Sequence, residues 1–236
     1  MGNKGKVLID GDIIAYRAAF STQDGSPDDA IKKTDEVISY IIDECVGLPF
    51  ASSPSDYQVY LTGSGNFRYD LAKSYDYKGN RKHTDKPQYL NVTRDHLTES
   101  YGAITSFGEE ADDLIAKEAA ALDYHCVVAS IDKDMLQIPC THYNFGKGVW
   151  SKVEPFQGAK FFYTQILTGD RADNIIGIHG VGPVKADKLL SECNTEQSLW
   201  EAVVKAYNGD TERVLENARL LWLRRYDGQL WEPPEP

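Results

Sequence analysis

Residues 6–12 of the chain are Lys6-Val7-Leu8-Ile9-Asp10-Gly11-Asp12, a short apolar run that ends in carboxylates. A run of this length and character is typical of a buried strand. Asp10 then stands at the carboxyl end of the strand, where ligand crevices form in open α/β sheets. The stretch therefore predicts a buried strand that brings an acid to one edge of a sheet.

Strand and helix patterns alternate along the part of the chain that follows. Further strands are expected at residues 56–61, 103–107 and 125–130, and helices from Ser26-Pro27 and over residues 109–122. Residues 143–151 carry Gly146-Lys147-Gly148 at their centre and predict a hairpin. After about residue 155 only helical patterns remain. The pattern predicts the α/β class, with a mostly parallel central sheet flanked by helices and a helical C-terminal lobe.

The expected organisation is a core over residues 1–155 and a helical lobe over residues 156–236 packed on it. Within the core, residues 66–101 are polar, rich in Lys, Arg, Asp and Tyr, and weakly periodic. Segments of this kind leave the packed core as loops. We therefore predict a short flexible arch at about residues 66–101.

The charge balance of the 236-residue chain is acidic, with 36 Asp and Glu against 25 Lys and Arg and a net charge of −11. Taken alone this balance argues against a nucleic-acid partner, because phosphates are neutralised by basic residues. Two readings stay open: a soluble acidic surface, or acids gathered around a divalent cation. No apolar run approaches the roughly 18 residues of a membrane span, and the four cysteines are far apart with no Cys-x-x-Cys pair. We expect a cytoplasmic protein with reduced thiols and no membrane association.

Acids occur at four suggestive places. Each has a plain structural explanation, since acids cap helices and follow strands in turns. Together they would crowd one edge of the sheet, where they would not all ionise without a cation. Mg²⁺ or Mn²⁺ suits an all-carboxylate site, and two such ions roughly 3.5–4 Å apart hydrolyse phosphodiesters. The acidic places are Asp10; Glu109, Glu110, Asp112 and Asp113; Asp132 and Asp134; and Asp170 and Asp173.

Two segments have the character of nucleic-acid contacts. Residues 178–186 have the form of a helix-hairpin-helix, in which Gly180 and Gly182 expose backbone amides and Pro183 opens a helix that can hold a phosphate. Residues 75–82 interleave basic and aromatic side chains, so that Lys78 and Arg81 could meet phosphates and Tyr77 could stack on a base. Taken alone, the first has a turn between packed helices as its less favoured explanation, and the second is better explained by a solvated basic loop.

In this order and spacing the motifs resemble the flap endonuclease family of 5′ nucleases, which includes phage-encoded 5′→3′ exonucleases and the 5′-nuclease domain of bacterial DNA polymerase I. The resemblance covers most of the chain, and residues 218–231 look most like the phage enzymes. The segments that carry it are Ile9-Asp10-Gly11 with Tyr16-Arg17, Tyr77-Lys78-Gly79-Asn80-Arg81, Glu110-Ala111-Asp112-Asp113, Asp132-Lys133-Asp134, Gly169-Asp170 with Asp173-Asn174, and Gly180-Val181-Gly182.

The resemblance implies a PIN-like 5′-nuclease core and a helix-hairpin-helix (helix-three-turn-helix) at about residues 166–191. It implies a monomer that cleaves DNA at a 5′ end or flap, in the host cytoplasm if phage-encoded. Replication proteins and RNA–DNA hybrids are further partners that it leaves open. It also implies two Mg²⁺ or Mn²⁺ ions held by Asp10, Glu110, Asp112, Asp113, Asp132, Asp134, Asp170 and Asp173, and a K⁺ at the hairpin. The implied catalytic residues are Lys78, Arg81, Asp10 and Asp132, and the implied DNA contacts are Arg17, Tyr77, Lys78, Arg81, Gly180, Val181, Gly182 and Lys185.

Asp12 departs from the pattern, because relatives often carry a small polar residue at this position. It adds an acid that would support the ligands from outside or point away. It also fits a rival reading, a haloacid-dehalogenase-like phosphatase in which Asp10 is the nucleophile and Asp12 the general acid. Two more alternatives stay open: removal of RNA primers by the same site, and a DNA-binding protein that kept the fold and lost catalysis.

Overall fold

The computed structural model describes residues 5–45, 56–81 and 85–235. The structure divides into two units that are not consecutive along the chain. Unit 1 is formed by Met1–Gly65 and Asp85–Val153, and unit 2 by Asn66–Thr84 and Glu154–Pro236. Across the three described ranges, no helix is long and apolar enough to cross a membrane.

Unit 1 is built on a six-stranded sheet with the strand order β3-β2-β1-β4-β5-β6. The first four strands of this order and β5 pair in parallel, and only β5 and β6 are antiparallel. The mostly parallel sheet and the hairpin are therefore confirmed. The strands are β1 (Lys6–Asp10), β2 (Tyr57–Ser64), β3 (Ile104–Phe107), β4 (Cys126–Ala129), β5 (Thr141–Asn144) and β6 (Val149–Lys152).

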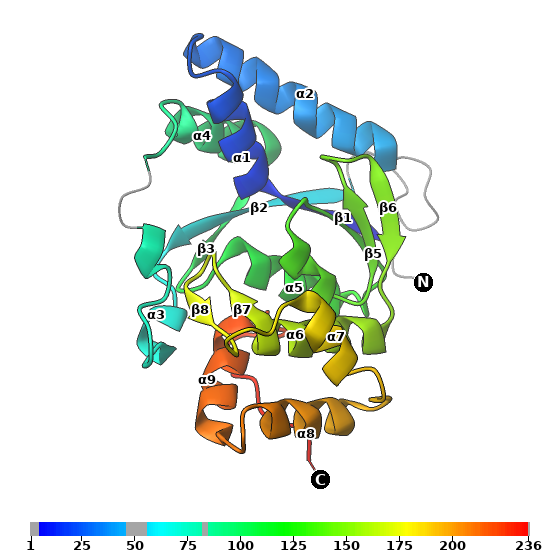
Figure 1. Cartoon of the computed structure of the whole chain (residues 1–236). Coiled ribbons are helices and arrows are strands. Elements are labelled where there is room, and N and C mark those ends of the chain that lie inside the picture. Colours follow the sequence, from blue (N-terminus) through cyan, green and yellow to red (C-terminus); the bar gives the residue numbers. More distant parts are fainter. Residues whose placement is uncertain (1–4, 46–55, 82–84, 236) are drawn as a thin grey trace. The chain divides into compact units, whose positions relative to one another are not determined.

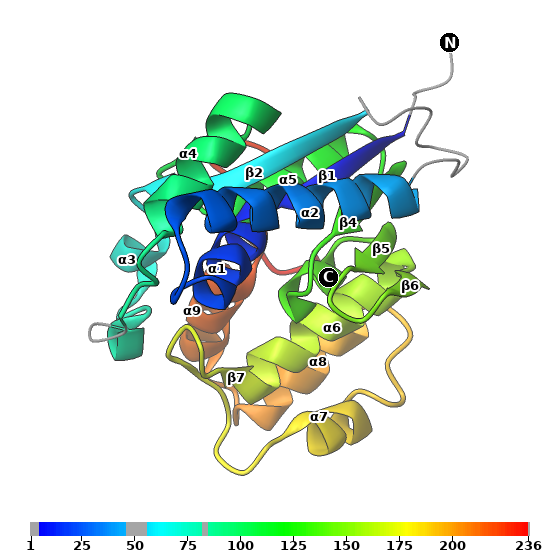
Figure 2. The same cartoon turned by 90° about the horizontal axis from the view of Figure 1, so that it is seen from above.

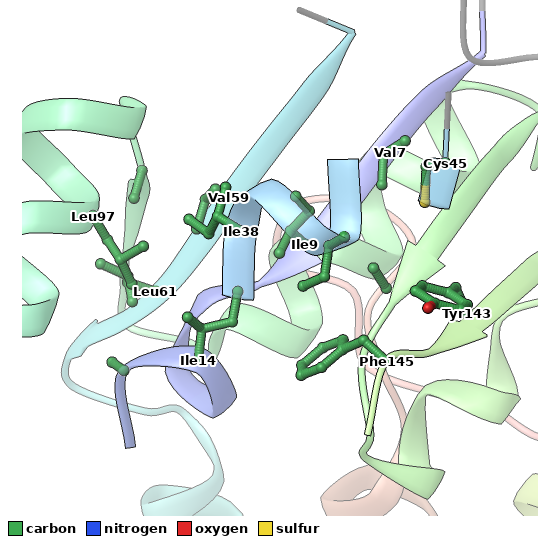
Figure 3. Close-up of a cluster of buried hydrophobic side chains, with 14 of the residues drawn as sticks. Val7, Ile9, Ile14, Ile38, Cys45, Val59, Leu61, Leu97, Tyr143 and Phe145 are labelled. Atoms are coloured by element: carbon green, nitrogen blue, oxygen red, sulfur yellow. The ribbon is translucent and has the colours of Figure 1, made fainter. Parts of the chain in front are cut away.

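Helices cover both faces of this sheet. On one face lie α1 (Gly11–Ser21), α2 (Pro27–Cys45) and α4 (Leu90–Tyr101), and on the other lies α5 (Ala111–Ala121), as Figure 1 shows. The first face encloses a core of aliphatic and aromatic side chains from these helices and the strands (Figure 3). The short helix η2 (Lys133–Gln137) follows β4. Burial of these apolar faces drives the strands and helices together.

The turn from β1 to α1 is tight because Gly11 passes close to β2. A Cβ atom at Gly11 would meet the carbonyl oxygen of Tyr60 at 2.6 Å and a methyl group of Val59 at 2.7 Å. Only glycine fits at that approach. The chain can therefore enter α1 directly after Asp10, which keeps this carboxylate at the end of the buried strand.

Unit 2 is mainly helical, with a core that includes Phe162, Tyr163, Leu199 and Val214. Helices α6 and α8 pack against each other and run side by side (Figure 2). Two two-residue strands, β7 and β8, form an antiparallel pair that the sequence pattern did not predict. The elements are α3 (Arg68–Leu71), η1 (Gly79–Arg81), α6 (Pro155–Thr168), β7 (Gly169–Asp170), β8 (Ile175–Ile176), α7 (Pro183–Leu189), α8 (Glu196–Ala206) and α9 (Thr211–Leu221).

The prediction that residues 66–101 form one flexible arch is wrong. Its last part is α4, whose Leu97 is fully buried in unit 1 and whose Thr93 hydroxyl donates to the carbonyl of Ala15. Its first part belongs to unit 2, where buried Arg68 donates hydrogen bonds to the carbonyl oxygens of Leu220 and Trp222 at the end of α9. Residues 82–84 lie outside the described residues. The polar composition hid two packed segments because their anchors are far apart in sequence.

Candidate functional site

Asp10 lies at the carboxyl end of β1 and is 2% exposed. One carboxylate oxygen accepts from the backbone N–H of Ile13 at 3.2 Å, which caps α1. The other accepts from the hydroxyl of Ser130 at 2.7 Å. Asp10 is therefore held in one orientation by the first turn of α1 and by the residue that follows β4.

Asp132 is tied to Asp10 through the same serine. The Ser130 hydroxyl oxygen accepts from the N–H of Asp132 at 3.0 Å while its proton is donated to Asp10. Asp132 in turn accepts from the N–H of Asp134 at 2.9 Å. Asp134 lies 3.3 Å from the ammonium of Lys133, so its charge is already balanced in part.

The acids at the start of α5 divide into three roles. Asp113 is fully buried and accepts from the N–H of Glu110 at 3.1 Å, so it caps the helix. Glu109 is paired with Lys117. Asp112 lies close enough to Asp10, Glu110, Asp132 and Asp113 for their charges to add to burial in raising its pKa. Helix capping and ion pairing therefore account for Asp113 and Glu109. Asp112 remains as the acid that lies near Asp10 and Asp132.

Burial and mutual repulsion disfavour the charged forms of these carboxylates. Burial, followed by the charges of Asp12 and Asp132, raises the pKa of Asp10 to about 7 against its hydrogen bonds from Ser130 and Ile13. Burial and the neighbouring acids, Asp10 first among them, also raise the pKa of Asp112 well above its usual range. A cluster of oxygen ligands that repel one another fits a hard divalent cation, which would restore their charged forms.

The carboxylates are gathered but do not yet converge on one point. Among the described residues, no three His, Cys, Asp or Glu side chains already stand where they could hold one metal ion. The residues of unit 1 thus fit a divalent cation by chemistry and proximity.

In unit 2, Asp173 is surrounded by the basic and aromatic segment that precedes it in sequence. Its carboxylate accepts from the Tyr77 hydroxyl at 2.7 Å and from the Arg81 guanidinium at 2.7 Å, and the Lys78 ammonium lies at 3.8 Å. Its backbone oxygen accepts from the N–H of Lys78 at 2.8 Å. Asp170 is buried and accepts from the N–H of Ala172 at 2.6 Å. Unit 2 therefore brings Lys78, Arg81 and Asp173 together.

Tyr77 and Val181 do not have the exposed side chains that DNA contacts require. The ring of Tyr77 is 4% exposed, belongs to the core of unit 2 and packs edge-on against the exposed Tyr69. This burial corrects the prediction that it stacks on a base. Val181 is 8% exposed and belongs to the same core, so only its backbone could reach a phosphate. The sequence could not separate these residues from their neighbours, the half-buried Lys78 and the exposed Gly182.

The remaining predicted contacts are exposed. Gly180 has φ +73°, a left-handed conformation that favours glycine, and Gly182 caps α7, which begins at Pro183 as predicted. Lys185 is exposed on α7. In unit 1, Arg17 is exposed on α1 with its guanidinium 5.7 Å from the ring centre of Phe145.

Comparisons with known proteins identify the family and the fold. The family model of the 5′-3′ exonuclease N-terminal resolvase-like domain matches residues 6–171, which is more than half of the chain. The chain belongs to this 5′-3′ exonuclease family. Among family members, the 5′-3′ exonuclease of Mycoplasma pneumoniae is 27% identical over 84% of this chain and 75% of its own length.

Other relatives of this family are longer proteins. DNA polymerase I of Rhizobium leguminosarum is 29% identical over 82% of this chain, which spans only 21% of the polymerase. In solved structures, the flap endonuclease of bacteriophage T5 in a complex with DNA and metal ions has a TM-score of 0.71 at 17% identity, covering 92% of this chain and 88% of that one. Flap endonuclease-1 from Methanococcus jannaschii has a TM-score of 0.59 at 15% identity, covering 96% and 81%. These likenesses establish the 5′-nuclease fold.

The polar residues that hold these acids in place were not evident from the sequence. Ser130 bridges Asp10 and Asp132, and its only sequence signal is its place directly after a buried strand. Asp12 is paired with Arg94, and its second oxygen accepts from the N–H of Thr62 at 2.9 Å. Both carboxylate oxygens of Asp12 therefore have partners, which accounts for the extra acid at this position.

Proposed function

We propose that the chain is a divalent-metal-dependent 5′ nuclease that hydrolyses DNA phosphodiesters at or near 5′ ends. The observation that carries the proposal is the set of Asp10, Asp112 and Asp132 around one edge of the sheet, with raised pKa values for the first two. Membership of the 5′-3′ exonuclease family supports the same activity.

The side chains of unit 1 would act as oxygen ligands. Asp10, Asp112 and Asp132 would bind Mg²⁺ or Mn²⁺, with Glu110, Asp113 and Asp134 in support. Ser130 would keep Asp10 and Asp132 oriented by its two hydrogen bonds. When bound, the ions lower the pKa of water and stabilise charge on the phosphate. The assignment of Asp170 and Asp173 to the ligand set rests on the sequence motif and stays a prediction.

Lys78 and Arg81 would bind the phosphate that is cleaved. Both are charged and lie within 4 Å of one carboxylate oxygen of Asp173. An anionic phosphate can replace that oxygen as their acceptor. The two side chains would then stabilise charge that develops on the phosphate during cleavage. Gly180, Gly182 and Lys185 would bind the duplex backbone without reading its sequence.

The phosphatase alternative requires Asp12 to exchange a proton with a substrate. Its carboxylate is instead committed to Arg94 and to the backbone of Thr62. These contacts disfavour the phosphatase. A phosphatase would also have no use for the four acidic segments of the family pattern.

One assay separates the candidate functions. The purified chain is incubated with Mg²⁺ and three substrates: a 5′-labelled flapped DNA duplex, the same duplex with an RNA strand, and p-nitrophenyl phosphate. The proposal predicts metal-dependent release of label from DNA and no turnover of the small ester. Turnover of the ester alone would support the phosphatase. Binding of DNA without release of label would support an inactive DNA-binding protein.

A further inference from the structure

Asp12, Arg94 and Thr62 form a closed group of contacts beside the acid cluster of unit 1. The guanidinium of Arg94, on α4, donates one hydrogen bond to Asp12 and another to the carbonyl oxygen of Thr62. Asp12, on α1, accepts from the N–H of Thr62 at 2.9 Å. The backbone donor and acceptor of Thr62 are therefore both bound by one ion pair. We call these three residues the clamp.

The clamp lies where the sheet is irregular. Thr62 belongs to β2, and the pairing of β2 with β3 shifts its register between Leu61 and Ser64. Backbone groups at such a shift lose their ladder partners and need others. Arg94 is suited to this task because its planar fork can bridge a carboxylate and a carbonyl at once, which a lysine cannot do.

The side chain of Thr62 extends the clamp to α5. Its hydroxyl oxygen accepts from the N–H of Ala111 at 2.9 Å. Ala111 is the first residue of α5, so its N–H has no partner inside the helix. The next residue is Asp112. The clamp thus joins the start of α1, two residues after Asp10, to the start of α5, one residue before Asp112.

We propose that Asp12 and Arg94 are positioning residues that set the distance between Asp10 and Asp112 for metal binding, through Thr62. The inference rests on the proposed function, since it takes these two acids as ligands of a divalent ion. It gives the extra acid of this chain a definite role: Asp12 supplies no ligand but holds Thr62 together with Arg94, which offsets part of its charge beside the cluster. Groups that orient metal ligands typically change metal affinity about 10- to 100-fold when removed.

The test measures Mg²⁺ affinity by calorimetry in the absence of DNA. Thr62→Val keeps the shape of the side chain and removes only the acceptor for Ala111, and Thr62→Ser keeps the acceptor. Arg94→Lys keeps the charge and loses the fork. The inference predicts that Thr62→Val and Arg94→Lys bind Mg²⁺ about 10-fold more weakly or worse, while Thr62→Ser stays near the parent chain. Lys6→Met, which breaks the ion pair with Glu118 elsewhere in unit 1, is the matched control and should bind as the parent does.

Three results would overturn the inference. Equal affinity in the parent, Thr62→Val and Arg94→Lys would show that the clamp does not position the ligands. Tighter binding in Arg94→Met, reversed by adding Asp12→Asn, would show that Arg94 acts only through its charge. Weak binding in Thr62→Ser as well as Thr62→Val would show a general packing effect. If the parent chain itself binds no Mg²⁺, the proposed function fails together with the inference.

Discussion

At the scale of single residues, Asp10 combines a structural task with a costly charge. It caps α1 and bonds Ser130, yet burial and the nearby acids raise its pKa to about 7. An amide of the same shape keeps one acceptor oxygen for the N–H of Ile13, its NH2 group can donate to the Ser130 hydroxyl oxygen, and it carries no buried charge. Such conflicts between stability and local preference are typical of functional sites.

We therefore predict that Asp10→Asn raises the stability of the metal-free protein at about pH 8 while abolishing cleavage. The gain should be on the order of 1–2 kcal/mol, or roughly 2–8 °C in Tm, because an ionised buried acid is removed. Thermal melts with a chelator measure it.

Asp35 of unit 1 gives the matched control. Burial alone would raise its pKa, but hydrogen bonds from His96 and Tyr101 outweigh burial and lower it. Asp35→Asn should therefore destabilise the protein and leave cleavage intact. A fall in Tm for Asp10→Asn would mean that its charge is not strained in the metal-free state.

The sequence predicted the acids but not which of them are taken up by structural partners. Asp10, Asp112 and Asp132 follow from motif and strand position. The neutralisation of Asp12 by Arg94 and the burial of Tyr77 depend on partners 82 and 96 residues away. A local pattern carries no information about which distant side chain fills a contact, so these roles appear only in the folded chain.

At the scale of elements, residues 73–81 are held in unit 2 at both ends. The Glu216 carboxylate accepts from the N–H groups of Lys73 and Ser74, both at 2.8 Å, and from the Ser74 hydroxyl at 2.6 Å. At the other end, Arg81 donates to Asp173. The segment that carries Lys78 is thus held by acids at its two ends and by the buried ring of Tyr77 between them.

Glu216→Gln should loosen this segment. The substitution removes the negative charge that accepts from Ser74 and pairs with Arg213. Hydrogen bonds to a charged group contribute roughly 1.5–3 kcal/mol, so amide exchange over residues 73–81 should accelerate at least about 10-fold. The exposed neighbour Glu212→Gln is the control. Unchanged exchange in Glu216→Gln would show that other contacts fix the segment.

Lys78→Ala should slow cleavage more than it weakens DNA binding. The backbone at Lys78 has φ +54°, a conformation that costs alanine as much as lysine, so the change removes only the side chain. We expect a single-turnover rate about 100-fold lower and a Kd changed by less than about 10-fold. Lys73→Ala, an exposed lysine of the same segment, should do neither. Equal losses of rate and affinity would make Lys78 a backbone anchor.

Periodicity accounts for most elements of unit 1. Strands β1, β2, β3 and β4 and helices α2 and α5 lie where apolar patterns and the Ser26-Pro27 start placed them. It missed α4 because Leu90 and Leu97 stand among polar residues, and it missed β7 and β8 because two-residue strands have no period. Periodicity also could not assign Asn66–Thr84 to unit 2, because this assignment depends on the contact of Arg68 with the end of α9.

At the scale of the whole molecule, the acidity of the chain links metal binding to stability. Asp10 has a pKa of about 7 in the folded protein, above its unfolded value of 3.8. Its protonated form therefore stabilises the metal-free fold below about pH 4, and this contribution is lost as the pH rises through about 7. A divalent ion binds the charged form, so its effect runs in the opposite direction.

We predict that excess Mg²⁺ raises Tm more at about pH 8 than at about pH 5. At a concentration 100-fold above Kd the ion should add about 2.7 kcal/mol, or roughly 5–10 °C. Melting curves over this pH range with Mg²⁺ and with a chelator measure the difference. A stabilisation that is equal at both pH values would argue against binding to Asp10.

Metal-dependent cleavage through the acid cluster is best tested with a 5′-labelled flapped duplex. The parent chain and Asp132→Asn are compared for cleavage, and their DNA affinity is measured alongside in a chelator. The exposed Asp24→Asn serves as the control. We expect Mg²⁺-dependent release of label by the parent and the control, and a rate at least about 100-fold lower in Asp132→Asn with DNA affinity retained. Cleavage by Asp132→Asn at the parent rate, or by the parent without any divalent metal, would contradict this expectation.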